Sequence, residues 1–189
     1  FDPGGARCRF ARCQRVFART GRFRLCAMEF ASLGKQRIFD ALGAALAKND
    51  LSRPAFKRRL KRYARDMRED ETYPFFIFDE SRELLLGGLT LSHVRRGVTQ
   101  SCSLGYWIGS PFERRGYMTA AVRTIIPFVF DRLNLHRLEA ACLPNNKPSI
   151  RLLERTGFQR EGLARRYLRI NGKWQDHILF ALVSDDPRP

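Results

Sequence analysis

Residues 113–117, Glu-Arg-Arg-Gly-Tyr, could bind an anionic ligand through the backbone. They lead into an expected helix, and the first amides of a helix are unpaired and lie at the positive end of its dipole. Gly116 has no side chain to keep a ligand away from these amides. A diphosphate would fit there, although a plain helix start explains the same residues. The segment is neither a Walker loop nor a GxGxxG fingerprint, because no GK[ST] sequence and no further glycines follow.

A second polar segment, residues 145–158, follows an expected strand. Asn145 and Asn146 could form a turn, and Ser149 could be the N-cap of a short helix that ends at Gly157. Taken alone, this segment therefore has an ordinary structural explanation.

Hydrophobic spacing and turn residues predict the elements that would position these segments. Helices are expected at residues 55–68, 118–133 and 149–156, and Pro127 should bend the second of them. Strands are expected at residues 73–78, 83–92, 101–108, 136–142, 166–170 and 177–183. Asn171 and Gly172 are a favoured hairpin turn between the last two strands. This order predicts an α+β fold with a mixed, mostly antiparallel sheet flanked by helices.

The chain of 189 residues is strongly basic, with 35 Lys and Arg against 19 Asp and Glu and a formal net charge of +16. Such a charge attracts polyanions, which include nucleic acid, a ribosome, an anionic membrane surface and a phosphorylated cofactor. A GC-rich genome would also produce part of the arginine excess. The charge alone therefore does not name the partner.

Cysteines and apolar runs restrict the class of protein further. The 5 cysteines include no CxxC pair and no histidine lies at ligand spacing, which argues against a disulfide framework and a zinc site. The longest apolar runs, residues 41–47 and 125–130, are shorter than the roughly 18 residues that a membrane helix needs. The arginine-rich N-terminal segment lacks the apolar core of a signal peptide. We therefore expect a cytoplasmic protein without a metal.

Together, the two polar segments resemble the acetyl-CoA-binding motifs of the GCN5-related N-acetyltransferase (GNAT) superfamily. That pattern is [QR]-x-x-G-x-[GA] at a helix start, then a strand, then N-x-x-[AS] and a short helix that closes at Gly-Phe. Here Glu113 takes the place of the Gln or Arg, Gly116 that of the glycine and Met118 that of the second small residue. Further stretches are similar to the RimJ/RimL type of ribosomal-protein-alanine N-acetyltransferase, and most of all to RimJ. These stretches are residues 105–109, 116–119, 146–149, 157–158, 161–162 and 171–177.

The resemblance implies the GNAT fold and the transfer of acetyl from acetyl-CoA to a primary amine. For the RimJ/RimL type the implied acceptor is the N-terminal alanine of a ribosomal protein. The positive charge of the chain adds ribosomal RNA as an expected contact, and the short apolar runs indicate no membrane partner. A small amine or drug is an alternative acceptor, because the cofactor-binding motifs do not determine which acceptor binds. Another alternative is a catalytically weak ribosome- or RNA-binding protein that uses the basic helix at residues 55–68.

The resemblance also implies that acetyl-CoA binds between the strands at residues 101–108 and 136–142. Backbone groups of Trp107 and Ile108 would align the pantetheine, and Asn146 would hold the cofactor arm. The backbone amides expected at the pyrophosphate are those of Arg114, Arg115, Gly116, Tyr117, Met118 and Thr119.

Catalysis requires a hydrogen bond or a proton for the departing thiolate. Many relatives supply it with a tyrosine four residues before the Gly-Phe pair, where this chain has Leu153. Ser149 lies one helical turn earlier and is the available hydroxyl, beside the cofactor arm; its N-cap role stays open.

The reaction also requires a deprotonated amine. Glu139, Tyr167 and Asp176 are the candidate bases, and they could equally be a paired strand carboxylate, an edge aromatic and a hydrogen-bond acceptor near a turn. His136 and His177 are the histidines of the matching region, and histidine commonly titrates near neutral pH. A water relay to solvent, with no single base, is a further alternative.

Residues 1–47 differ from the rest of the chain. Relatives carry Phe-Leu-x-x-Trp-Glu-Pro where this chain has residues 38–47, Ile-Phe-Asp-Ala-Leu-Gly-Ala-Ala-Leu-Ala. One coding of these residues, read one nucleotide later, gives Phe-Leu-Thr-Pro-Trp-Glu-Pro-Arg-Trp. We therefore expect residues 1–47 to be a divergent or frame-shifted segment and residues 48–189 to be the acetyltransferase domain.

Overall fold

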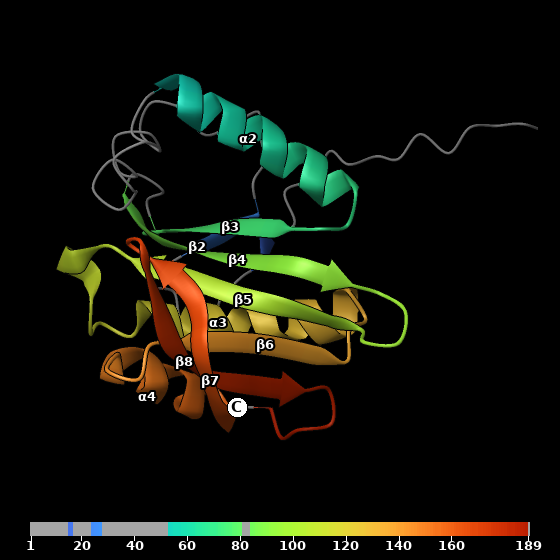
Figure 1. The fold of residues 1–189 in the computed structure, drawn as a ribbon. Coiled ribbons are helices and arrows are strands. Elements are labelled where there is room, and N and C mark those ends of the chain that lie inside the picture. The colour runs from blue at the N-terminus through green and yellow to red at the C-terminus, as the bar shows by residue number, and fades with distance from the viewer. Residues whose placement is uncertain (1–14, 17–23, 28–52, 81–83, 189) are drawn as a thin grey trace, which may run out of the picture.

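A computed structural model of the chain describes residues 15–16, 24–27, 53–80 and 84–188. The described strands form one eight-stranded sheet in the order β1-β2-β3-β4-β5-β6-β8-β7 (Figure 1). The strands are β1 (Arg15–Val16), β2 (Arg24–Ala27), β3 (Tyr73–Phe78), β4 (Leu85–Arg95), β5 (Ser101–Ile108), β6 (Arg137–Cys142), β7 (Gln159–Ile170) and β8 (Lys173–Val183). Neighbouring strands are antiparallel except β5 and β6, which are parallel. The predicted α+β fold with a mixed, mostly antiparallel sheet is confirmed.

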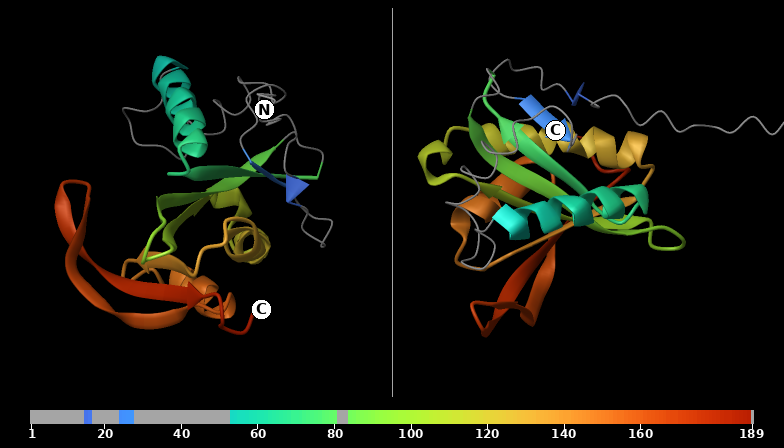
Figure 2. Two further views of the ribbon diagram at one scale, coloured as in Figure 1. Left: turned by 90° about the vertical axis from the view of Figure 1, so that its right-hand side faces the viewer. Right: turned by 90° about the horizontal axis from the view of Figure 1, so that it is seen from above.

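Helices cover both faces of this sheet. α2 (Arg53–Arg68) lies on one face, whereas α3 (Tyr117–Pro127) and α4 (Lys147–Arg155) lie on the other (Figure 2). The core lies between the sheet and α3, because α3 is apolar along the side that faces the strands. Its buried residues are Met118, Ala121, Val122, Ile125 and Ile126. The short helix η2 (Ser110–Phe112) connects β5 to the loop before α3.

The helix expected at residues 118–133 is in fact two helices of different geometry. α3 ends at Pro127, and a π-helical turn, η3 (Phe128–Arg132), follows it. The hydrogen bond from Leu133 N to Phe128 O, at 2.9 Å, closes this wider turn. Proline has no N–H to continue the α-helical ladder and its ring crowds the preceding turn. Pro127 thus stands where the helix changes from α to π, and the bend expected at Pro127 stays a prediction.

β7 and β8 are longer than the sequence predicts, since the strands expected at residues 166–170 and 177–183 span Gln159–Ile170 and Lys173–Val183. β7 is the edge strand and exposes nearly all its side chains, so it lacks the alternation that marks a half-buried strand. Asn171 and Gly172 form the expected hairpin turn, and their positive φ angles of 49° and 80° are those of a type I′ turn. The hairpin extends away from the rest of the sheet (Figure 2).

β1 and β2 belong to the segment 1–47, and β2 pairs with β3 from Arg24 opposite Phe78 to Ala27 opposite Phe75. Part of that segment therefore adds strands to the sheet. Residues 38–47, on which the frame-shift hypothesis depends, lie outside the described residues, so that hypothesis and the boundary at 47/48 stay predictions. Within the described part of the chain, no helix has the length and apolar character to cross a membrane.

Candidate active site

β5 and β6 are paired at one end only. Their parallel ladder joins Ser101 to Arg137 and ends where Ser103 lies opposite Glu139, although β5 continues to Ile108 and β6 to Cys142. On their other edges, both strands stay paired along these later residues, β5 with β4 and β6 with β8. The facing edges of the later residues are therefore free of ladder hydrogen bonds. Such backbone groups can hydrogen-bond an extended ligand that lies between the strands.

Two glycines of β4 fix the end of β5. Gly88 lies opposite Trp107 and Gly87 opposite Ile108. A Cβ at Gly87 would lie 2.5 Å from the Trp107 carbonyl oxygen, and a Cβ at Gly88 would lie 2.8 Å from the Trp107 indole Nε1. Only glycine permits this close packing, which holds the backbone of Trp107 and Ile108, two predicted cofactor contacts, against β4.

The loop before α3 turns sharply into the helix. Gly116 is the N-cap with a left-handed backbone, φ 82°, and Arg114 also has a positive φ of 58°. Gly116 offers no side chain to cap the first amides of the helix, and the side chains of Arg114 and Arg115 are exposed nearby in the chain. Helix-start amides beside two guanidinium groups are a donor set that suits a diphosphate.

The other predicted cofactor contacts around α3 can contribute mainly through their backbones. Met118 is buried in the core, and Tyr117 and Ile108 pack partly against that core. Thr119 is half-buried in the first turn of the helix. Met118 therefore differs from the small residue of the family pattern by filling the core with its side chain.

The alternative in which Ser149 is a helix N-cap is wrong. α4 begins at Lys147, and its N-cap is Asn146, whose side-chain oxygen accepts a hydrogen bond from Ser149 N at 3.2 Å. Asn is as good an N-cap as Ser, and Pro148 suits the first turn of a helix. The hydroxyl of Ser149 is therefore not needed as the cap.

The Ser149 hydroxyl instead forms a hydrogen bond of 2.5 Å with the Tyr106 hydroxyl, so that β5 and α4 are joined. Burial raises the pKa of Tyr106 to about 12, although the bond to Ser149 opposes this shift. Burial also raises the pKa of the Cys142 thiol at the end of β6, and a hydrogen bond with Ser149 opposes that shift. Sequence reasoning missed Tyr106 as a site residue. The alternation along β5 could have indicated it, because alternation puts Tyr106 on the same face of the strand as the buried Cys102 and Leu104.

Glu139, a candidate base, is half of an ion pair. Arg137 Nε lies 2.9 Å from a carboxylate oxygen of Glu139, and the same guanidinium binds both carboxylate oxygens of Glu161 on β7. The hydrogen bond from Arg137 holds the pKa of Glu161 below its ordinary value. Glu139 thus belongs to a cluster that joins β6 to β7.

The other candidate bases lie on the β7–β8 hairpin or near it. The Asp176 carboxylate accepts a hydrogen bond of 2.7 Å from the backbone N of Arg166, and the Tyr167 ring packs edge-on against His177 at 5.8 Å. His136 hydrogen-bonds the Ser184 hydroxyl. In the part of the chain that the structure describes, no hydrogen bond joins these candidate bases to Ser149. The structure brings Ser149 together with Tyr106 and Cys142 instead.

A mixed sheet whose parallel pair separates beside an uncapped helix start is the kind of site that the resemblance to acetyl-CoA-dependent acetyltransferases predicts. The family profile described as "Acetyltransferase (GNAT) domain" matches residues 30–159. The chain belongs to this GNAT acetyltransferase family, whose members use acetyl-CoA as the acetyl donor.

Individual relatives agree with this assignment. The chain is 38% identical over 130 residues to the probable N-acetyltransferase YjcK of Bacillus subtilis (strain 168), across 69% of this chain and 72% of the relative. It is 37% identical over 122 residues to the ribosomal protein uS5-alanine N-acetyltransferase of Escherichia coli (strain K12), across 65% of this chain and 63% of that enzyme. Its structure resembles Mycobacterium smegmatis RimJ in complex with CoA-disulfide, with a TM-score of 0.73, 28% identity and coverage of 86% and 82%. The predicted resemblance to the RimJ/RimL type is confirmed.

Proposed function

We propose that the protein transfers acetyl from acetyl-CoA to the N-terminal amine of a ribosomal protein that begins with alanine. The observation that carries this proposal is the separation of β5 from β6 after Ser103, next to the uncapped start of α3. The similarity to an enzyme named for the alanine of ribosomal protein uS5 supports the acceptor.

The chain's own residues divide the binding of acetyl-CoA between three elements. The free edge of β5 at Trp107 and Ile108 aligns the pantetheine, and Asn146 at the start of α4 contacts the cofactor arm. The amides of residues 114–119, with the guanidinium groups of Arg114 and Arg115, hold the diphosphate. For β5 and the start of α3, this division agrees with the backbone groups that each leaves without a ladder bond or a side-chain cap.

The candidate bases Glu139 and Asp176 already have hydrogen-bond partners, which favours an acceptor amine that is largely deprotonated without a base. Glu139 is paired with Arg137, and Asp176 accepts from the backbone of Arg166. An N-terminal amine has a reference pKa near 7.7–8.0, against about 10.4 for lysine, so a larger fraction is the free base at neutral pH. A water relay can then remove the remaining proton, with no base among Glu139, Tyr167 and Asp176.

Mass spectrometry of one peptide with two amines tests the acceptor. The peptide begins with alanine and contains an internal lysine, and the control is the same peptide with its N-terminus already blocked. We expect acetyl on the α-amine of the first peptide and none on the blocked one. Acetyl on the lysine of either peptide would contradict an α-amine acceptor. Turnover with polyamines or drugs but with neither peptide would show that the acceptor is a small amine.

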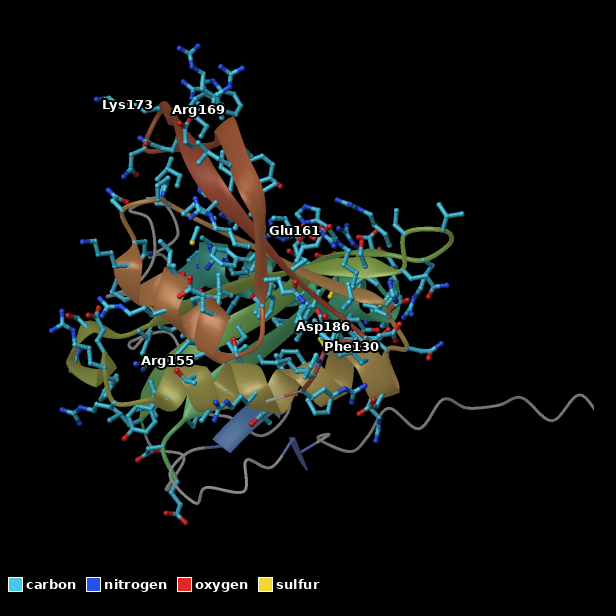
Figure 3. All side chains as sticks on the ribbon, turned by 90° about the horizontal axis from the view of Figure 1, so that it is seen from below. Phe130, Arg155, Glu161, Arg169, Lys173 and Asp186 are labelled. Carbon is cyan, nitrogen blue, oxygen red and sulfur yellow. The ribbon has the colours of Figure 1, made fainter. Side chains whose placement is uncertain are left out.

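A second proposed role is contact with RNA through the hairpin arm, residues 163–176. Five of the seven large apolar side chains exposed in the described residues lie there, including Tyr167 (48% exposed) and Trp174 (60%). Four cations of the arm are exposed with them, namely Arg165, Arg166, Arg169 and Lys173, and Figure 3 shows Arg169 and Lys173 at its tip. Exposed aromatic rings beside arginines are typical of surfaces that stack bases and bind phosphates. On α2, by comparison, the Tyr63 ring is half-buried and has the Arg62 guanidinium 5.8 Å from its centroid.

RNA binding at several salt concentrations tests this role. We expect the double substitution Arg169→Ala, Lys173→Ala to weaken binding of single-stranded RNA. The slope of the logarithm of the affinity against the logarithm of the salt concentration should become shallower by about one for each lost phosphate contact. The matched control, Lys61→Ala with Arg62→Ala on α2, should bind as the unchanged protein does. Weaker binding by the α2 variant alone would move the role to α2. Self-association through the arm, without RNA binding, would contradict it.

A further inference from the structure

Two hydroxyl groups and a thiol meet where β5 and β6 have separated. Tyr106 belongs to the part of β5 without ladder bonds to β6, Cys142 is the last residue of β6, and Ser149 is in the first turn of α4. The Tyr106 and Ser149 hydroxyls are 2.5 Å apart, and Ser149 is only 9% exposed. The proposed acetyl-CoA site and this pair therefore share the same strand ends.

The hydrogen-bonding capacity of each group restricts how the pair is arranged. A serine hydroxyl has one hydrogen to donate and can accept two, and the phenol is the more acidic of the two hydroxyls. Because burial raises the pKa of Tyr106 to about 12, its phenol keeps its hydrogen at neutral pH. With Asn146 capping the Ser149 amide, the Ser149 hydroxyl has no structural duty at the helix start. Donation to Ser149 from both Tyr106 and the Cys142 thiol uses the two acceptor positions of the serine oxygen and leaves the serine hydrogen free for another acceptor.

We propose that Tyr106 is a positioning residue that holds the Ser149 hydroxyl so that Ser149 donates its hydrogen to the sulfur of CoA. This inference rests on the proposed function, in which acetyl-CoA lies between β5 and β6. During transfer the amine nitrogen bonds to the carbonyl carbon, and the carbon–sulfur bond breaks with its electron pair on sulfur. The proton that the nitrogen loses is the one the thiol gains, so Ser149 and Tyr106 end unchanged. A hydrogen bond from Ser149 stabilises the thiolate before that proton arrives.

The test measures the pKa of the CoA thiol on the protein, by the ultraviolet absorbance of the thiolate, and needs no acceptor. Calorimetry first shows that CoA binds to each protein. The variants are Tyr106→Phe, Ser149→Ala and the two combined. The matched control is Tyr73→Phe, which removes another partly buried tyrosine hydroxyl. Tyr73 is on β3, and its hydroxyl hydrogen-bonds Asp70 at 2.6 Å.

In the unchanged protein we expect a bound thiol that is more acidic than that of free CoA. Ser149→Ala and Tyr106→Phe should each reduce the thiolate fraction at a given pH, by about tenfold for the serine, because a hydrogen bond to a charged group is lost. The double variant should equal Ser149→Ala, since Tyr106 acts through the serine. Tyr73→Phe should leave the thiol pKa unchanged.

A thiol pKa that changes in Ser149→Ala but not in Tyr106→Phe would overturn the positioning role. No change in either variant, with CoA bound, would show that the pair does not contact the sulfur. Failure of the unchanged protein to bind CoA would instead overturn the proposed function. If Tyr106→Phe does not fold, a fluorinated tyrosine at position 106 keeps the shape, and its more acidic phenol should increase the thiolate fraction. An unchanged fraction would contradict the inference.

Discussion

Gly116 joins two requirements at one residue, a left-handed backbone and free space in front of the helix amides. Its φ is 82°, and a Cβ built there would meet no other atom within 4 Å. We expect Gly116→Val to weaken the affinity for acetyl-CoA at least tenfold, about 1.4 kcal/mol, because the side chain would occupy the approach of the diphosphate. Calorimetric titration with acetyl-CoA measures this.

Gly172 is a matched control for that substitution. It has nearly the same backbone, φ 80°, with equally open surroundings, but it lies in the β7–β8 turn. Gly172→Val pays the same left-handed backbone strain, of order 1–2 kcal/mol, and should bind acetyl-CoA normally. Equal loss of affinity in both variants would mean that strain, and not the diphosphate site, explains Gly116→Val.

At the scale of elements, the packing of β5 on β4 depends on Gly88. A Cβ there would lie 2.8 Å from the Trp107 Nε1 and 3.1 Å from the Phe75 carbonyl oxygen. We expect Gly88→Ala to reduce the free energy of unfolding by about 1–3 kcal/mol, as overpacking in a core does. Urea unfolding measures the change. Gly105→Ala, whose Cβ would meet only the Thr90 carbonyl oxygen at 4.0 Å, should be close to neutral, and a loss as large as that of Gly88→Ala would contradict the steric explanation.

The start of α4 depends on the side chain of Asn146. Asn146→Ala removes the acceptor for Ser149 N and should reduce the free energy of unfolding by about 1 kcal/mol. Asn146→Asp keeps an acceptor oxygen and should retain most of that stability. Thermal unfolding without CoA separates this effect from cofactor binding. Equal stability of the Ala variant and the unchanged protein would rule out the cap.

Local patterns predict some of these elements well and others poorly. The strand at residues 101–108 and the left-handed Gly157 after α4 could be predicted, because alternation and a missing Cβ are properties of the local sequence. The pairing of Glu139 with Arg137 and the bond between Tyr106 and Ser149 could not be predicted with certainty. The second of these contacts joins residues distant in sequence, and only the register of the sheet and the position of α4 bring them together.

At the scale of the whole molecule, one ion pair joins the turn after α2 to the turn after β4. Arg96 Nε lies 2.6 Å from Asp70, and this hydrogen bond holds the pKa of Asp70 below its ordinary value of 3.8. The pair therefore stabilises the folded state above that ordinary pKa, and the stabilisation is lost as the pH falls through the lowered pKa. Because both side chains are more than a third exposed, we expect Asp70→Asn to cost less than about 1 kcal/mol at neutral pH.

Unfolding of Asp70→Asn across the acidic range checks the sign of this effect. The variant should have a lower free energy of unfolding than the unchanged protein at neutral pH. This difference should disappear in strong acid, where Asp70 is protonated in both the folded and the unfolded state. A double-mutant cycle with Arg96→Gln assigns the difference to the pair. A difference that grows as the pH falls would contradict the assignment.

The account as a whole depends on CoA lying between β5 and β6 at the start of α3. Titration of isotope-labelled protein with CoA, followed by the backbone amide resonances, tests this most directly. We predict that the largest changes in these resonances occur at residues 104–108 and 115–119, and that those at the hairpin arm, residues 163–176, stay small. Changes confined to the arm or to α2, with residues 104–108 unaffected, would contradict the account.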